Sequence, residues 1–150
     1  MKTPAWLHFA LNEIGVKEIA GALANARINL YHAITTLRAT SDEVPWCASY
    51  TCWCLEKAGV KSPRSAAARD FLNWGEVVVS PFIGCVVVIA RASANPKSAH
   101  VGFWFGENEE HVFILSGNQG NQVSVAAFNK NQILGYRMPN SRGVKPDGLH

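Results

Sequence analysis

The chain has 150 residues, of which 48% are hydrophobic and 17% are charged, and its formal net charge is +3. This composition is typical of a folded globular protein and excludes an intrinsically disordered chain. The sequence contains no run of eighteen or more apolar residues, so no transmembrane helix is predicted. The small positive charge favours an anionic partner, such as a bacterial wall or a nucleic acid, without distinguishing between them.

The first half of the chain shows helical periodicity. In the first helix Thr3 is the expected N-cap, Pro4 occupies the first helical position, and Gly15 marks the stop. The third helix is expected to begin at Trp46, directly before Cys47. In chain order, helices are predicted over 4–14, 24–38, 46–59 and 65–74.

The second half changes to short runs rich in β-branched and aromatic residues, separated by turn residues. Helices followed by a meandering sheet predict an α+β domain, in which N-terminal helices pack on a mainly antiparallel sheet of about five to six strands. We expect one domain over 1–140 and a flexible tail over 141–150. The predicted strands are 76–80, 85–90, 100–105, 111–115, 122–128 and 134–138.

Four cysteines occur, and three of them are expected to be small buried hydrophobic residues: Cys52, Cys54 and Cys85. Cys52 and Cys54 are two positions apart in one predicted helix, so their side chains point about 200° from each other and cannot pair. Their spacing lacks the second pair that a zinc site needs, and no metal is expected. An unpaired set of thiols suits a reducing compartment.

Cys47 and His100 carry the clearest chemical signal. Cys47 lies in the first turn of a predicted helix, where the positive end of the helix dipole favours a thiolate. His100 begins a predicted strand, from which an imidazole can take the thiol proton and later return it to a leaving group. The backbone N–H of Cys47 is the candidate donor to an oxyanion. This pattern predicts a cysteine hydrolase with Cys47 as nucleophile and His100 as base.

A third group is expected to orient the imidazole ring of His100. Asn118 is the first candidate, since it lies at the end of the next strand, and Gln119 is the second, with substrate binding as its other predicted role. Turn formation is the structural alternative for this run. Asp42 and Glu43 precede the nucleophile and could reach the site, although capping of the helix explains them equally.

Two tryptophans lie close to the catalytic segments. Trp46 and Trp104 could form the walls of a groove for a peptide or a sugar, and core packing is the alternative for both. Gly102 shares a strand face with His100, and its small size would leave room for a thiol or a substrate. Glu18 could line the groove or lie in a solvated loop.

Several runs together resemble the small CHAP-like family of cysteine, histidine-dependent amidohydrolases and peptidases, which occur in phage endolysins and related bacterial proteins and are similar to NlpC-type wall peptidases. The runs are DEVPWCASYTCWCLEKAG, SAAARDFLNWG, SAHVGFWFG, ILSGNQGNQVSV and ILGYRMP. The resemblance covers the chain from about Trp6 to Pro139. It implies a papain-like fold, no cofactor, and hydrolysis of an amide bond in peptidoglycan by Cys47 and His100. It also suggests an acidic residue at the position of Glu18.

One position departs from the family. Members usually carry an acidic residue after the glycine of the strand before the histidine, where this chain has Gly84 and Cys85. Three alternatives to an endolysin stay open: a non-catalytic wall-binding module, a secreted antibacterial effector, and an intracellular cysteine peptidase. The bond that is cut also stays open.

The expected partner is peptidoglycan, with no nucleic acid, no membrane insertion and a monomeric state. The N-terminal stretch lacks the uninterrupted apolar core of a secretory signal. We therefore expect synthesis in the cytoplasm and action on the wall or in the periplasm after release, aided by a holin or another export agent.

Overall fold

The computed structural model describes residues 3–18, 26–35, 46–91 and 98–140. Asp42, Glu43, the predicted tail and both ends of the predicted second helix lie outside these ranges. The helices are α1 (Ala5–Asn12), α2 (Ala26–Ala33), α3 (Cys47–Lys57), and the short 3₁₀ helices η1 (Ala68–Asn73) and η2 (Lys130–Gln132). The strands are β1 (Glu76–Val77), β2 (Val86–Ala90), β3 (Ala99–Glu107), β4 (His111–Gln119), β5 (Gln122–Asn129) and β6 (Ile133–Met138).

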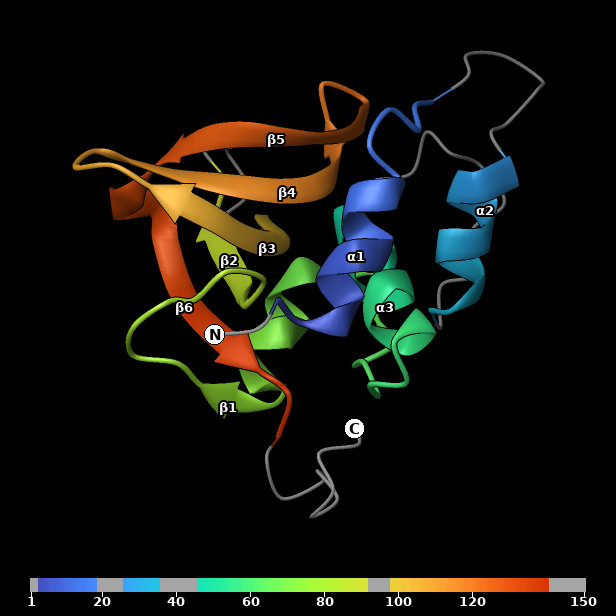
Figure 1. The fold of residues 1–150 in the computed structure, drawn as a ribbon, viewed down its shortest axis with the longest axis horizontal. Coiled ribbons are helices and arrows are strands. Elements are labelled where there is room, and N and C mark those ends of the chain that lie inside the picture. Colours follow the sequence, from blue (N-terminus) through green and yellow to red (C-terminus); the bar gives the residue numbers. More distant parts are fainter. Residues whose placement is uncertain (1–2, 19–25, 36–45, 92–97, 141–150) are drawn as a thin grey trace.

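The six strands form one open sheet in the order β1-β6-β2-β3-β4-β5, and every neighbouring pair is antiparallel. The three α-helices gather beside this sheet, with α3 packed on β3 and β4 (Figure 1). The predicted α+β class, with N-terminal helices on an antiparallel sheet, is therefore confirmed. The predicted fourth α-helix is the 3₁₀ helix η1.

Burial on both faces explains the central position of β2. Its run Val86–Ile89 is continuously apolar, and all four side chains are buried. Val86 and Val88 join the larger core between helices and sheet, whereas Val87 and Ile89 join a smaller cluster with Val112 and Ile114. Each fully buried side chain of this kind contributes about 1.5–3 kcal/mol relative to exposure. The sheet is thus built around a strand that water does not reach.

The start and the end of α1 differ from the prediction in detail. Pro4, rather than Thr3, is the N-cap, and no side chain caps the helix. Proline fits there because its φ of −60° and ψ of 145° are extended, and its missing N–H has no helical partner in any case. After the helix, Gly15 takes a φ of 98° and donates its N–H to Val123 O at 3.1 Å. The turn carries the following residues to the start of β5.

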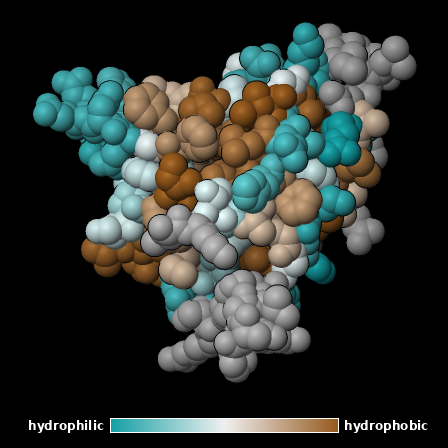
Figure 2. Space-filling model, in the orientation of Figure 1, coloured by the Kyte–Doolittle hydropathy of each residue, from teal (hydrophilic) through white to brown (hydrophobic). Residues whose placement is uncertain are grey.

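The surface is mixed in character. The tip of the β3–β4 hairpin is hydrophilic, with residues 107–110 exposed, and it forms the projection at the upper left of Figure 2. Exposed apolar side chains lie on and after β1, where Val79 is 90% exposed and Val77 is 69% exposed. Among the described residues, no helix is long and apolar enough to cross a membrane.

Candidate active site

Cys47 is the first residue of α3, and only 4% of its surface is exposed. The first hydrogen bond within this helix runs from Tyr50 N to Trp46 O at 2.9 Å. The N–H groups of the residues between them, beginning with Cys47, therefore have no acceptor inside the helix. These donors and the helix dipole favour negative charge at the Cys47 sulfur and beside it.

Trp46 does not form a groove wall, and the prediction that it binds substrate is wrong. Its side chain is fully buried, it stacks on Tyr31 with ring centroids 5.9 Å apart, and its indole N–H donates to Glu18 Oε1 at 2.7 Å. The acidic residue at position 18 thus anchors the indole instead of lining a groove. Together these contacts fix the beginning of α3 and, with it, the position of Cys47.

Trp104 is also not placed as a groove wall. It packs against the smaller apolar cluster and donates its indole N–H to Glu107 Oε1 at 3.3 Å. It is absent from the residues that line the two clefts beside Cys47 and His100. For both tryptophans, packing is the role that the structure supports.

His100 lies in β3, is 2% exposed, and is held by Gln119. The distance between His100 Nε2 and Gln119 Oε1 is 2.9 Å. The orientation of the Gln119 amide follows from its other contacts, because its NH₂ group donates to Ile114 O at 3.1 Å and to Ser124 O at 2.7 Å. Since Oε1 can only accept, Nε2 of the imidazole must be the protonated nitrogen. Nδ1 then carries the free electron pair and is the basic atom.

The partner of the His100 ring is therefore Gln119, and the expectation that favoured Asn118 is corrected. Asn118 has a φ of 60°, in the left-handed region that asparagine tolerates better than most residues. The β4–β5 register shifts between Ser116 and Gln119, so one extra residue enters β4 there. Such a bulge re-aims the side chains that follow it. Asn118 supplies the backbone conformation, and Gln119 receives the hydrogen bond.

Close packing explains why position 117, the first of the G-N-Q run, is a glycine. A Cβ atom at this position would collide with the ring of Trp46 and would lie 3.1 Å from Tyr50 Cβ. Glycine therefore lets the end of β4 approach the first turn of α3 directly. This close contact brings the strand that carries Gln119 against the helix that carries Cys47.

Gly102 also serves close packing, which corrects the expectation that it leaves room for a substrate. A Cβ atom there would lie 2.6 Å from Ile114 Cγ2, 2.6 Å from Ser116 Cβ and 2.7 Å from Leu115 O. The space beside Gly102 is thus filled by β4. Its small size fixes the spacing of β3 and β4 rather than opening a cavity.

The electrostatics separate Cys47 from the other thiols. Burial raises the pKa of Cys47. The nearby charge of His100, the hydrogen bonding of the sulfur with the His100 side chain and the Val101 backbone, and the charge of Arg91 together outweigh burial, and the pKa falls to about 7. Burial instead raises the pKa of each of the other cysteines, to about 11 for Cys85. The structure therefore holds one thiol that is readily ionised near neutral pH.

Arg91 is a site residue that the sequence analysis missed. It follows β2 directly, and its side chain turns toward β3, where Nε donates to Ala99 O at 3.3 Å and Nη2 lies 3.2 Å from His100 Nδ1. An arginine can only donate, so this contact supports a free electron pair on Nδ1. The signal was available in the predicted pairing of the strands, since an antiparallel connection between β2 and β3 brings residue 91 beside residues 98 and 99.

Two clefts meet at this constellation. The first, which we call the cysteine cleft, has a volume of about 290 Å³ and is lined by Cys47, residues 66–69, Ser98 and Ala99. The second, the histidine cleft, has a volume of about 580 Å³ and is lined by His100, Gln119, Phe128 and neighbouring residues of β5. Arg91 and Asn118 line both. They mark the junction between the two spaces.

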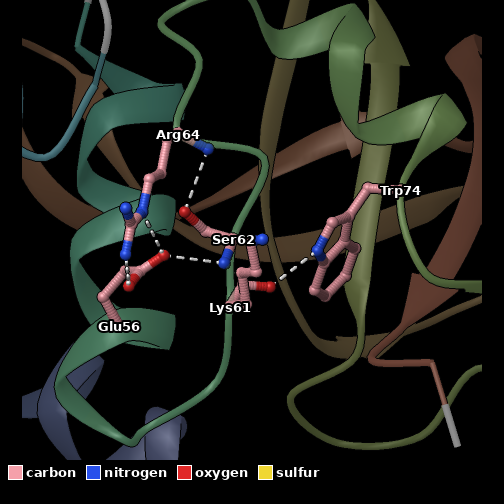
Figure 3. Close-up of polar contacts among 5 residues, drawn as sticks. All are labelled: Glu56, Lys61, Ser62, Arg64 and Trp74. Carbon is pink, nitrogen blue, oxygen red and sulfur yellow. Dashed lines mark hydrogen bonds and ion pairs between the residues drawn. The ribbon is translucent and has the colours of Figure 1, made fainter. Parts of the chain in front are cut away.

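A clamped loop supports the wall of the cysteine cleft. Figure 3 shows Glu56 reaching from α3 to this loop, where it accepts hydrogen bonds from Ser62 N at 2.8 Å and from Arg64 Nη2 at 3.0 Å. On the other side, Trp74 donates its indole N–H to Lys61 O at 2.9 Å. Residues 66–69 follow this loop directly, so the clamp fixes where the cleft wall begins.

The described residues contain no group of three or more histidine, cysteine, aspartate or glutamate side chains that could hold a metal ion. Fold and site thus define an α+β protein in which a buried cysteine, a histidine and a glutamine meet where two clefts join. No protein-family model matches the chain, and no curated protein matches it.

Iodoacetamide should alkylate Cys47 much faster than any other cysteine, with a half-maximal rate near pH 7. The rate should rise with pH, because the thiolate is the reactive form and its fraction increases as the pH passes the pKa. Peptide mapping by mass spectrometry over a pH series measures this directly. Cys85→Ala should leave the profile unchanged, whereas His100→Ala should move it to higher pH. Labelling of Cys85 ahead of Cys47 would contradict the electrostatic account.

Proposed function

We propose that the protein is a cysteine amidase or endopeptidase that hydrolyses an amide bond of peptidoglycan. The observation that carries this proposal is the position of His100, whose Nε2 is fixed by Gln119 and whose charge lowers the pKa of the Cys47 thiol. A nucleophile, a base and an orienting group in this order are the requirement for nucleophilic attack on an amide. The choice of peptidoglycan rests on the resemblance to CHAP-like hydrolases.

The first half of the proposed reaction forms an acyl-enzyme. Nδ1 of His100 exchanges its contact with Arg91 for the thiol proton, and the Cys47 thiolate attacks the carbonyl carbon of the amide. The N–H groups at the start of α3 donate to the oxygen as it becomes negative. The imidazolium returns its proton to the amide nitrogen, the C–N bond breaks, and an amine leaves.

The second half releases the acid. A water molecule gives a proton to Nδ1 of His100 and attacks the thioester carbon. The tetrahedral intermediate collapses, the C–S bond breaks, and the proton passes from the imidazolium to the Cys47 sulfur. Gln119 keeps the ring in one orientation through both halves, so that Nδ1 stays directed at the sulfur and the leaving group.

Digestion of purified sacculi tests the proposal. The protein should release new amino groups or free stem peptides, and mass spectrometry of the fragments should identify the bond that is cut. No new reducing sugar ends should appear, since the described clefts contain no carboxylate pair of the kind that glycosidases use. Reducing ends without new amines would contradict amide hydrolysis. Binding to sacculi without any product would favour the non-catalytic wall-binding module.

The same assay separates the remaining alternatives. Cleavage of soluble peptides with intact sacculi left untouched would favour an intracellular cysteine peptidase. Lysis of permeabilised Gram-negative cells would support action on the wall after release from the cytoplasm, as proposed for an endolysin or a secreted effector.

A further inference from the structure

We propose that Arg91 is a substrate-binding residue that anchors a carboxylate group next to the scissile amide, so that the site selects acidic peptides. This inference deepens the proposed function and rests on it in taking a peptide as the ligand. It is carried by the position of Arg91 at the junction of the two clefts, beside both reacting side chains.

Arg91 has donors to spare. Its Nε and one N–H of Nη2 account for the contacts with Ala99 O and His100 Nδ1. A guanidinium carries five N–H donors, so three remain: two on Nη1 and one on Nη2. Among the described residues no carboxylate forms an ion pair with Arg91. The guanidinium therefore presents a planar pair of donors that matches a carboxylate.

The charge of the clefts points to the same ligand. No aspartate or glutamate lies among the described residues that line either cleft, whereas Arg69 and Arg91 both line the cysteine cleft. A positive cleft of this kind attracts an anionic ligand and repels a cationic one. The histidine cleft adds apolar and amide surface from Phe128 and Gln132, which suits the rest of a peptide.

The position of Arg91 limits which carboxylate it can reach. Its Nη2 lies 3.2 Å from Nδ1 of His100, the atom that exchanges a proton with the thiol and the leaving group. A carboxylate on Nη1 and Nη2 would thus belong to a residue that directly flanks the amide under attack. Loss of that group should weaken the binding of a peptide beside Cys47.

Protection of Cys47 from alkylation tests this without requiring turnover. The probes are acetyl-alanyl-glutamyl amide and the matched glutaminyl peptide, with the second residue in both the L and the D configuration. The rate of Cys47 alkylation is measured at pH 9. Because the charge of Arg91 also lowers the pKa of Cys47, the rate of each variant with peptide is compared with the rate of the same variant without peptide. In the wild type, the glutamyl peptide of at least one configuration should half-protect Cys47 from alkylation at a concentration about tenfold or more below the one that the matched glutaminyl peptide needs.

Arg91→Gln should bring the ratio between the two peptides close to one, and Arg91→Lys should give an intermediate ratio, because a lysine lacks the planar fork. Lys61→Gln is the matched control, because it also removes one positive charge, here from an exposed residue. The contact of Lys61 with Trp74 uses the backbone carbonyl, which the substitution keeps, so this variant should show the wild-type ratio. Equal protection by both peptides in the wild type, or an unchanged ratio in Arg91→Gln, would overturn the inference. Failure of the proposed function would show instead as intact sacculi.

Discussion

Cys47→Ala should abolish hydrolysis of sacculi and of soluble stem peptides, with a loss on the order of 10⁴-fold or more. The reason is that the variant retains the oxyanion donors and the clefts but has no atom that can form the acyl-enzyme. Cys47→Ser should be almost as inactive, since a hydroxyl ionises far less readily than a thiol whose pKa is about 7. The measurement is release of amino groups over time, with folding checked by circular dichroism.

Cys85→Ala is the matched control for this loss. Cys85 is also fully buried, and removing its sulfur leaves a comparable small void, but it lines neither cleft. Its stability should fall by an amount similar to that of Cys47→Ala while its activity is retained. Activity should also persist in EDTA. A Cys47→Ala protein with full activity would end the cysteine-hydrolase proposal, and activity that EDTA removes and zinc restores would indicate a metal enzyme.

His100→Ala should lower turnover nearly as far as loss of the thiol, because the two groups act as one unit and their effects do not add. Gln119→Ala should be milder, with a loss of about tenfold to a thousandfold in kcat and little change in KM. The imidazole remains in that variant, but it points at Cys47 for only part of the time. Turnover of a soluble stem peptide by each variant and by the double variant measures the contrast.

Asn118 provides the control next to Gln119 in sequence. Asn118→Gly should keep most of the activity, because glycine adopts a φ of 60° without strain. Asn118→Ala should lose about 1–2 kcal/mol of stability, because alanine is strained in the left-handed region. Thermal unfolding checks the second expectation. If Asn118→Gly lost more turnover than Gln119→Ala, the assignment of the orienting role to Gln119 would be wrong.

Much of the fold follows from local patterns in the sequence. The change from helical periodicity to short β-rich runs predicted the order of elements, and each predicted strand overlaps an observed one. The start of α3 was predicted within one residue, because the helical pattern begins directly after Pro45. Patterns of this kind depend on which neighbours a residue has along the chain, and a sequence contains that information.

The residue that orients the His100 ring could not be predicted from local sequence patterns. Asn118 and Gln119 are adjacent, both carry amides, and both are compatible with a turn. The bulge in β4 and the left-handed conformation of Asn118 decide which of them faces His100. Both features depend on the pairing of β4 with β5 and on the contact of Gly117 with α3, which no local pattern reports.

The sequence by itself determined the class of the fold, the helix that presents Cys47, the strand that carries His100, and the chemistry that these two residue types favour together. Only the tertiary structure decided that Trp46 belongs to the core, that Gln119 fixes the ring of His100, and that Arg91 stands where the two clefts meet. The physical reason is the separation along the chain of the residues that interact. Periodicity and capping act between residues a few positions apart, whereas burial, hydrogen-bond partners and cleft walls come from segments that are distant in the chain and meet only after folding.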